Sequence, residues 1–439
     1  MFMKKTTLLF FAVSLFGLVS CNNEETGTEQ LDNAATKKIV LQGVDPAEGL
    51  FPEDDGATSL AAYDPNIQIY RLLRVADDTL GTSLGTVQIT AAQYAEIAEA
   101  VEEIIAGKRT EKAKYNAIFN WVVENTKYDS EGVNIEQSAY VTFTSHRANC
   151  QGYSNLINVM THCAGLRSFN VNGYLIYNKQ YLGHAWSYVH ADNIWYVCDA
   201  TNNRQWSCSG TSNYKDKLCP QSTDIAIWED DTYTYSFYNG LFGITRVKNT
   251  EGSILVVPFS KNGFQISIFN PMNKLSKDVK QIYLGKSVKS LGESYNLGLR
   301  IYDTESLEAV HVDPENPYLA SHKGVVYRRD GEKYQLDYVP TGADYIELSP
   351  KLYCVEKRTL ADNRNVNVLY IPEGVSIIEQ YAVEECPNLH YIYVPQYVNF
   401  VNGDGNMVEN PTSKTFYNVA SDCQVIRGPV PTGIVEVKM

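Results

Sequence analysis

The chain has 439 residues, which is long for a single hydrophobic core and favours two folded domains. Its composition, 44% hydrophobic and 20% charged, is that of a globular protein. The net charge of −14 disfavours binding to nucleic acid or to anionic lipid surfaces, because both carry negative charge themselves. The 31 tyrosines suit an extracellular binding surface and a β-rich core equally well.

The first residues have the pattern of an export signal. Lys4 and Lys5 precede an apolar run over residues 8–19, which is too short to span a bilayer comfortably. The run ends in LVSC at residues 18–21, which resembles a bacterial lipobox. This resemblance implies a lipoprotein signal peptide over residues 1–20 and attachment of a diacylglycerol to the thiol of Cys21. The alternative is an ordinary signal peptide in which the cysteine occurs by chance.

The residues that follow are polar and predict a solvated tether over residues 21–38. Glu24 and Glu25 resemble the acidic signals that direct some Bacteroidetes lipoproteins to the outer surface. We therefore expect an exported protein held by lipid alone at the outer membrane, on its periplasmic face or at the cell surface.

The next part of the chain predicts helices followed by an antiparallel sheet, which is an α+β layout. Two short strands are expected first, at residues 39–41 and 67–73. Helical spacing of apolar residues then predicts a helix over 90–105 with Thr90 as its cap, and a second helix over 112–126. A third helix is expected from Cys150 to Cys163, ending at Gly165. Aromatic and β-branched residues predict strands at 169–177, 184–190 and 193–201.

Three segments of this region carry reactive side chains. Cys150, in NCQGY, opens a predicted helix, whose unpaired N–H groups and dipole favour the nucleophilic thiolate. His184, in GHAW, and Asp199, in YVCDAT, lie on strands that are expected to be antiparallel neighbours. Asp199 could then hold one imidazole nitrogen while the other faces Cys150, which gives the nucleophile, base and orienting acid of thiol acyl transfer.

Residues 111–206 resemble the transglutaminase-like superfamily, whose catalytic geometry is papain-like. The resemblance is carried, in order, by FNWVVENTKYD, CQGYSNL, the Gly165 break, VNGY, HAW and W-x-x-x-D-A-T. It implies that Cys150 is the nucleophile, His184 the general base and acid, and Asp199 the residue that orients the histidine. The backbone N–H of Cys150 is expected to stabilise the oxyanion, and the sequence does not identify a second donor.

Further assignments follow from the same region. Gln151 and Trp186, next to catalytic positions, are candidate substrate-binding residues, and the catalytic domain is expected to cover residues 39–245. No cofactor is implied. No metal site is expected either, since no Cys or His pair has zinc spacing. In an oxidising compartment Cys208 and Cys219, separated by ten residues, are the best candidates for a disulfide.

The remainder, residues 246–439, predicts a β-rich repeat domain. Short apolar motifs recur at 282–291, 369–378 and 392–401, and the last two start 23 residues apart. A period in the twenties is typical of a solenoid whose units bury their apolar faces against one another. Over roughly residues 250–405 these segments, with VDPENP and GVVY between them, resemble the BspA-type leucine-rich repeats of bacterial surface proteins.

Two functions remain open at this stage. The first is a thiol enzyme that attacks an amide or peptide bond of a protein or peptide substrate through a thioester, with hydrolysis favoured over cross-linking because water is abundant. The second is a non-catalytic adhesin whose repeats bind a cell-surface or host protein or glycan.

Overall fold

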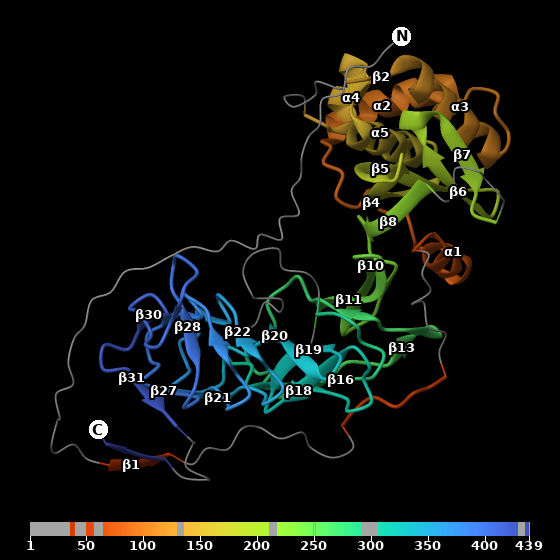
Figure 1. Cartoon of the computed structure of the whole chain (residues 1–439). Coiled ribbons are helices and arrows are strands. Elements are labelled where there is room, and N and C mark those ends of the chain that lie inside the picture. Colours follow the sequence, from red (N-terminus) through yellow and green to blue (C-terminus); the bar gives the residue numbers. More distant parts are fainter. Residues whose placement is uncertain are drawn as a thin grey trace. The chain divides into compact units, whose positions relative to one another are not determined.

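The protein is described by a computed structural model covering residues 36–39, 50–56, 65–129, 136–209, 217–248, 250, 252–291, 306–428 and 435–438 (Figure 1). The predicted signal peptide and Cys21 lie outside these residues. The chain forms two compact units, residues 47–306 with 310–320, and residues 321–439 with 1–46 and 307–309. No helix in the described ranges combines the length and the apolar character needed to cross a bilayer.

The first unit begins with five helices, shown in orange and gold in Figure 1: α1 (Pro65–Val75), α2 (Ala91–Ile104), α3 (Glu111–Asn125), α4 (Ala139–Ser145) and α5 (Cys150–Cys163). Between them lie the short parallel strands β2 (Lys127–Tyr128) and β3 (Arg147–Ala148). A five-stranded antiparallel sheet follows in the order β7-β6-β5-β4-β8. Its strands are β4 (Arg167–Tyr177), β5 (Gln180–Ala191), β6 (Ile194–Asp199), β7 (Arg204–Ser207) and β8 (Leu218–Thr223), with the 3-10 turn η1 (Ala200–Asn202) after β6.

Most of the elements predicted around the catalytic motifs are present. The Thr90 side chain accepts a hydrogen bond from the Gln93 N–H, and the Gln93 side chain accepts one from the Thr90 N–H, so a capping box starts α2 as expected. Helices α3 and α5 and strands β4, β5 and β6 also form within two residues of their predicted bounds at most ends. Gly165, at φ 76°, ends the α5 region in the left-handed conformation.

The strand predicted over residues 67–73 is wrong, because these residues belong to helix α1. Ile69, Leu72 and Leu73 are buried, at 0%, 0% and 4% exposure, and they follow one another at helical spacing. The exposed Arg71 and Arg74 occupy the other face. The buried positions of this segment fit the helical period, whereas its short run of apolar residues alone predicts a strand.

Helix α5 forms the centre of the hydrophobic core between the helices and the five-stranded sheet. Its buried residues pack with those of α2 and α3 on one side and with Val189, Ala191 and Cys198 of the sheet on the other. Polar side chains between α5 and the sheet are also paired: the Ser187 hydroxyl donates to the Asn170 side chain at 2.9 Å, and the Asn170 amide donates to Asn155 at 2.9 Å. The helix is thus fixed in position and direction relative to β4 and β5.

A second sheet follows in the same unit, in the order β15-β11-β10-β9. Its strands are β9 (Trp228–Glu229), β10 (Tyr233–Tyr238), β11 (Leu241–Val247) and β15 (Ile268–Phe269), with the hairpin β13 (Ser260–Lys261) and β14 (Phe264–Gln265). The domain boundary expected at residue 245 falls inside β11. Strands β12 (Ile254–Val256) and β16 (Gln281–Leu284) then pair in parallel, as successive turns of a solenoid do.

The repeats continue through β17 (Ala309–Val312), β18 (Leu319–His322), and the hairpin of β19 (Val325–Asp330) and β20 (Lys333–Tyr338). The following repeats supply the strands of three parallel ladders, at a spacing of about 23 residues except for the last step of two of the ladders, which is 33 residues. The ladders are β21 (Tyr345–Glu347), β24 (Val368–Tyr370), β27 (Tyr391–Val394) and β31 (Gln424–Arg427); β22 (Cys354–Val355), β25 (Ile377–Ile378) and β28 (Asn399–Val401); and β23 (Leu360–Ala361), β26 (Val383–Cys386) and β30 (Phe416–Val419).

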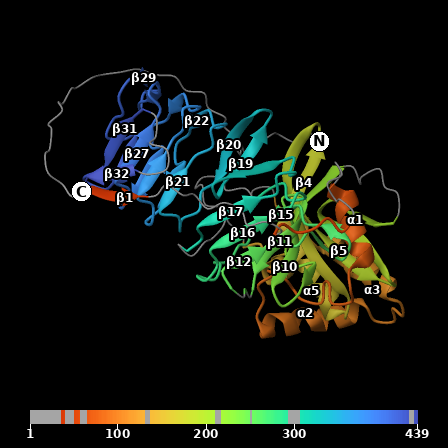
Figure 2. The same cartoon turned by 90° about the horizontal axis from the view of Figure 1, so that it is seen from below.

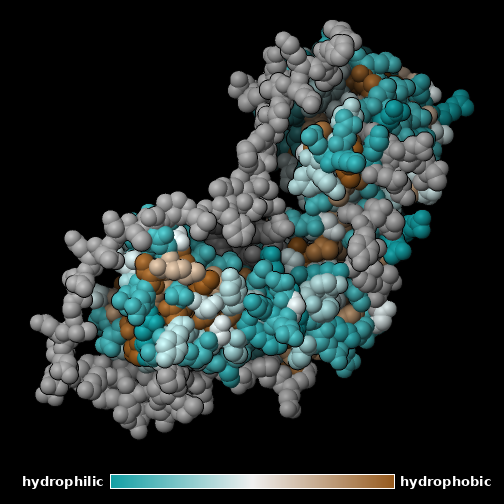
Figure 3. Space-filling model, in the orientation of Figure 1, coloured by the Kyte–Doolittle hydropathy of each residue, from teal (hydrophilic) through white to brown (hydrophobic). Residues whose placement is uncertain are grey.

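The leucine-rich-repeat solenoid predicted from the motifs is therefore confirmed, with about six turns. Figure 2 shows β21, β27 and β31 running in the same direction along one ladder. The buried residues between the ladders form one apolar cluster that includes Ile346, Leu369 and Ile392 at matching positions of successive turns. Over the visible face of the repeats, apolar side chains group in patches among polar ones (Figure 3).

Strand β29 (Met407–Val408) pairs with β28, and β32 (Val435–Lys438) pairs antiparallel with β1 (Thr36–Ile39) near the start of the chain. Residues 36–38 of the predicted tether therefore lie in a strand. Ile39 is likewise in β1, whereas residues 40–41 of the strand predicted there lie outside the described residues.

Candidate active site

The Cys150 thiol lies at the first residue of α5, as the sequence predicted. The preceding Asn149 caps the helix: its side-chain oxygen accepts from the N–H groups of Gln151 at 2.9 Å and Gly152 at 3.4 Å. The Asn149 N–H donates in turn to the Gln137 side chain at 2.9 Å. Because the cap occupies the next two N–H groups, the N–H of Cys150 stays available to a substrate oxygen.

His184 and Asp199 meet where β5 passes the end of β6. The register places Ser187 opposite Cys198, so Asp199, the last residue of β6, comes level with Trp186 and close to His184. The His184 Nε2 lies 3.0 Å from the Asp199 Oδ2, and both side chains are buried, at 9% and 0% residue exposure. The His184 ring also stacks on Trp186, with centroids 5.9 Å apart, which fixes its orientation.

The Cys150 thiol is hydrogen-bonded to His184. Since Asp199 occupies Nε2, the nitrogen facing the thiol is Nδ1. Burial alone would raise the pKa of the Cys150 thiol, but the hydrogen bond and charge of His184, with the N–H groups of Ala185 and Gln151, outweigh burial and lower it. The surroundings of Cys150 therefore favour the thiolate.

The histidine responds in the opposite direction. Burial alone would lower the pKa of His184, but its hydrogen bonds to Asp199 and Cys150, and the negative charges of both, raise it to about 9. The imidazolium and the thiolate stabilise each other, as expected for a cysteine and histidine that share a proton. The three residues that the sequence singled out are thus brought together in one site.

Asn202 belongs to this site but was not predicted. Its amide Nδ2 donates to the Asp199 Oδ2 at 2.9 Å and lies 3.4 Å from the His184 Nε2. Its backbone N–H donates to the other Asp199 oxygen at 3.3 Å. Asn202 therefore holds the carboxylate that holds the histidine. The signal was the short turn after YVCDAT, where an aspartate before a 3-10 turn is an ordinary cap.

Tyr128 is a second residue that sequence reasoning missed. It pairs with Ala148 across β2 and β3, two residues before Cys150, and it is 55% exposed. Burial of part of the ring and the negative charge of Cys150 raise the pKa of the Tyr128 phenol, so the hydroxyl stays protonated. The buried Tyr153 holds this segment by donating a hydrogen bond to the Thr126 carbonyl. The Tyr128 phenol therefore lies within electrostatic range of the thiol.

The two residues proposed to bind substrate have other contacts. Trp186 is 1% exposed and packs against His184, so it presents no surface to a substrate and supports the catalytic ring instead. The Gln151 amide donates to Asn155 at 3.0 Å, within the polar network under β4. Both side chains make contacts inside the domain. Trp186 in particular is too buried to contact a substrate as expected.

The predicted pairing of Cys208 with Cys219 is also corrected, since both are free thiols. Cys208 follows β7, and Cys219 lies in β8, so they flank opposite edges of the five-stranded sheet, roughly 19 Å apart at about 4.8 Å a strand. The buried Cys198 also differs from Cys150, because burial raises the pKa of its thiol to about 12.

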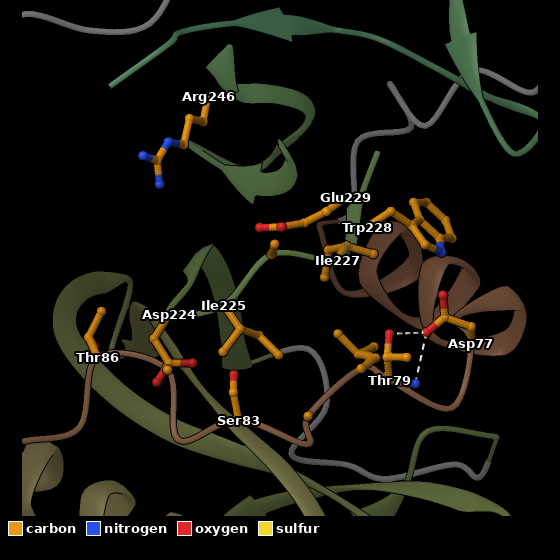
Figure 4. Close-up of a pocket in the computed structure, with 14 residues that line it drawn as sticks. Asp77, Thr79, Ser83, Thr86, Asp224, Ile225, Ile227, Trp228, Glu229 and Arg246 are labelled. Carbon is orange, nitrogen blue, oxygen red and sulfur yellow. Dashed lines mark hydrogen bonds between the residues drawn. The ribbon is translucent and has the colours of Figure 1, made fainter. Parts of the chain in front are cut away.

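A separate hollow of about 730 Å³ lies between the loop that follows α1 and the segment before β10 (Figure 4). Burial raises the pKa of the Asp224 carboxyl on its wall to about 7, and one oxygen of this carboxyl accepts from the Asn170 N–H at 2.8 Å. None of the three residues of the candidate active site lines this hollow. Among the described residues no group of three or more His, Cys, Asp or Glu is arranged to hold a metal ion.

Comparison with known proteins agrees with the site. Residues 98–200 match the family model of the Transglutaminase-like superfamily. These residues form a transglutaminase-like domain. The match spans the helix before Tyr128, all of α5 and the strands that carry His184 and Asp199, and it indicates a cysteine enzyme of the protease or transglutaminase type. Comparison with curated proteins gives no match.

Solved structures resemble parts of the chain. A candidate cysteine protease from Cytophaga hutchinsonii is 16% identical, with a TM-score of 0.25, over 34% of this chain and 52% of that one. A TGase is 22% identical, with a TM-score of 0.22, over 26% of this chain and 34% of that one. A leucine-rich repeat protein from Eubacterium ventriosum ATCC 27560 is 20% identical, with a TM-score of 0.22, over 28% of this chain and 32% of that one. The chain thus spans about half or less of the length of each, and TM-scores this low assign no activity.

Proposed function

We propose that the transglutaminase-like domain is a thiol enzyme that cleaves amide or peptide bonds through a Cys150–His184–Asp199 triad. The observation that carries the proposal is the convergence of a helix-terminal thiol, a histidine bonded to it and a buried carboxylate bonded to that histidine. A scaffold without chemistry gains no stability from a buried, mutually charged group of this kind.

In the proposed reaction the Cys150 Sγ attacks the carbonyl carbon, and the carbonyl oxygen becomes an oxyanion. His184, protonated at Nδ1, gives its proton to the departing amine as the C–N bond breaks, which leaves a thioester. Water then attacks the thioester, His184 takes the proton of the water, and the acid leaves with Cys150 restored. Asp199 keeps the ring in place and stabilises its charged form, with Asn202 holding the carboxylate.

Two donors support the oxyanion in this proposal. The first is the backbone N–H of Cys150, which the Asn149 cap leaves available. The second is the Tyr128 hydroxyl, which lies near the thiol and stays protonated. A backbone N–H and a hydroxyl from different elements can both donate hydrogen bonds to the same oxyanion, which stabilises the transition state.

Hydrolysis is proposed in preference to cross-linking, because water is abundant outside the cell. The test is a competition between water and an added primary amine for the acyl-enzyme, with mass spectrometry of the products. A product that is mainly the free acid supports a hydrolase. Mainly amide product would identify a transamidase on the same triad.

The proposal itself is tested with an irreversible amide-mimic probe directed at thiols. We expect the full chain to be labelled at Cys150, with Cys150→Ala unlabelled and Cys386→Ala labelled normally. Labelling that does not depend on Cys150 would contradict the triad. The Cys386 variant is a matched control because that thiol is buried in the repeats, at 0% exposure.

A second candidate function is binding by the repeats, favoured by one observation. On the ladder of β21, β24 and β27, residues at alternate positions point away from the buried Ile346, Leu369 and Ile392. These positions carry Tyr345, Glu347, Val368, Tyr370, Tyr391 and Tyr393, of which Val368 and Tyr393 are buried and the other four are partly exposed. The test measures binding to glycan and protein arrays by the full chain and by a double variant, Tyr370→Ala with Tyr391→Ala, and compares the two. Equal binding by both would remove this face from consideration.

We further propose that the protein is exported and held by lipid on Cys21, as the leader suggests. Growth with an alkynyl fatty acid should label the wild-type chain and leave Cys21→Ser unlabelled and released from the membrane fraction. A labelled Cys21→Ser protein would contradict the anchor. Protease treatment of intact cells would then distinguish the cell surface from the periplasmic face.

A further inference from the structure

The edge of strand β5 beside the catalytic residues has no neighbouring strand. Strand β4 pairs with β5 along its whole length, from Gln180 to His190, on one side. On the other side β6 pairs only with Ser187–Ala191. In the described ranges, no strand pairs with this second side of β5 from Gln180 to Trp186. The open stretch of edge leads directly to His184.

The direction of the main-chain groups on this edge follows from the hairpin turns. Asn178 and Lys179 both have positive φ, of 49° and 61°, which marks a two-residue turn closed by a hydrogen-bonded pair at Tyr177 and Gln180. Counting alternately from this pair, Gln180, Leu182 and His184 exchange hydrogen bonds with β4. The intervening Tyr181, Gly183 and Ala185 therefore direct their N–H and C=O groups to the open edge.

Two independent observations agree with this assignment. The Asp192–Asn193 turn between β5 and β6 is of the same kind, with φ of 49° and 61°, and it makes Ala191 and Ser187 the residues that bond to β6. The same alternation gives Ala185 an N–H on this side. The Ala185 N–H indeed donates to the Cys150 sulfur. The open edge thus presents Tyr181 and Gly183 in line with the thiol.

Gly183 has no role in the fold that requires a glycine. Its φ is not positive, and a Cβ built on it would meet no atom within 4 Å. Glycine in an extended, exposed strand costs conformational entropy, and it commonly marks a place where another backbone approaches closely. Gly173 on β4, which pairs with His184, differs because a Cβ there would clash with the Cys219 carbonyl at 2.2 Å. The space over Gly183 is therefore free for a bound chain.

The surroundings of the edge are apolar and nearly uncharged. Four side chains of the hairpin are exposed, at 38% to 65%: Tyr174, Tyr177, Tyr181 and Leu182. The rings of Tyr174 and Tyr181 meet edge to face, 5.9 Å apart. Paired residues of an antiparallel hairpin share a face, so Leu182 lies on the face of His184 and Tyr181 on the opposite face. A bound strand would find apolar contacts on both faces.

We propose that the open edge of β5 at Tyr181–Ala185 binds the acyl-donor substrate, and that this substrate is an extended polypeptide segment with apolar side chains. The segment adds a strand to the sheet, pairs with the main chain of Tyr181 and Gly183, and brings its scissile carbonyl to Cys150. This inference rests on the proposed thiol chemistry and names its substrate class.

The experiment compares two probes with the same acyloxymethyl ketone warhead on the full chain. One carries a single acetylated alanine, and the other carries the extended peptide acetyl-Phe-Leu-Ala. We expect the peptide probe to label Cys150 at least about tenfold faster, since it can make main-chain hydrogen bonds and apolar contacts at the edge that the single alanine cannot make. Equal rates for the two probes would overturn the inference.

The variant Gly183→Pro removes the outward N–H without removing a bond to β4, and proline is tolerated where a strand N–H faces solvent. We expect the rate of the peptide probe to fall to that of the single-alanine probe in this variant, a ratio that cancels any change in the reactivity of the thiol itself. Lys179→Gly, in the hairpin turn, is the matched control because every edge donor is kept. A peptide advantage that survives in Gly183→Pro would contradict the inference.

A third measurement does not depend on the folding of any variant. The peptide probe is methylated on one backbone nitrogen at a time, and the wild-type protein is labelled with each. Loss of the rate advantage at alternate nitrogens is expected for strand pairing. If all methylated probes react equally fast, no strand pairs at this edge. If neither probe labels Cys150 at all, the proposed thiol chemistry itself is contradicted. This outcome differs from equal labelling by both probes, which contradicts only the substrate-binding edge.

Discussion

The transglutaminase-like domain and the repeats use the same residue type in opposite ways. Cys150 and Cys386 are both cysteines at the ends of regular elements. Partners from β5 lower the pKa of the Cys150 thiol, whereas burial in the repeats raises the pKa of Cys386 to about 12. The comparison teaches that burial alone raises the pKa of a thiol. A cationic partner from another part of the chain shifts this pKa in the opposite direction.

The two regions also differ in how their cores are assembled. In the repeats each strand packs on the equivalent strand of the next turn, and matching apolar residues such as Ile346, Leu369 and Ile392 stack in register. In the transglutaminase-like domain, α5 packs on strands that follow it, and buried Asn170 and Ser187 are satisfied by one another. The repeats therefore present a periodic surface, and the transglutaminase-like domain presents a single polar site.

The largest expected effect comes from exchanging the two thiols for alanine. Cys150→Ala should abolish thioester formation, because Cys150 is the thiol whose pKa the hydrogen bond and charge of His184 lower. Cys386→Ala should leave the rate of Cys150 alkylation unchanged and cost only stability, since it removes a buried sulfur from the repeat core. Mass spectrometry of the acyl-enzyme measures the first effect and thermal unfolding the second. Acylation of the Cys150→Ala protein would break the comparison.

Asp199→Asn should have the next largest effect. Loss of the carboxylate charge removes one of the causes that raise the pKa of His184 to about 9, so this pKa falls toward its ordinary value. The imidazolium that stabilises the thiolate is then lost at lower pH. We expect turnover to fall on the order of 10²–10⁴-fold and the pH midpoint of Cys150 alkylation by iodoacetamide to rise. An unchanged pH profile would show that Asp199 does not act through His184.

Tyr128→Phe should lower turnover about 10–10²-fold, which is somewhat less than the loss of a donor from a fully enclosed oxyanion site, because Tyr128 is half exposed. Alkylation of Cys150, which forms no oxyanion, should be unchanged. The measurement is the ratio of the two rates in wild type and variant. An equal drop in both would indicate that Tyr128 supports the thiol and not the oxyanion.

Leu369→Ala in the repeats should not alter the rate at Cys150. The side chain is fully buried, at 0% exposure, between Ile346 and Ile392, so truncation should cost about 2–5 kcal/mol in the free energy of unfolding. Thermal unfolding with parallel alkylation assays checks this. A changed alkylation rate would show that the two regions are energetically coupled at the site.

Much of the fold around the site could be predicted from the sequence. The helical spacing of apolar residues after Thr90 predicted α2, the Cys150 motif predicted α5, and the aromatic and β-branched residues between 169 and 201 predicted three adjacent strands. The 23-residue spacing predicted the solenoid. Each of these patterns is local or periodic, so it can be recognised in the sequence without knowledge of the tertiary structure. The strand predicted at 67–73 failed because an apolar segment this short fits either period.

What the sequence by itself determined was the chemistry of the candidates, namely which thiol, which imidazole and which carboxylate. Only the tertiary structure decided their relations. The Asp199 carboxylate reaches Nε2, Asn202 and Tyr128 join the site, Trp186 turns inward, and Cys208 and Cys219 fall on opposite sheet edges. The open edge of β5 was equally invisible, because it exists only where β6 ends beside β5. The physical reason is that register and strand order arise from packing between segments distant in the chain, and no local pattern encodes them.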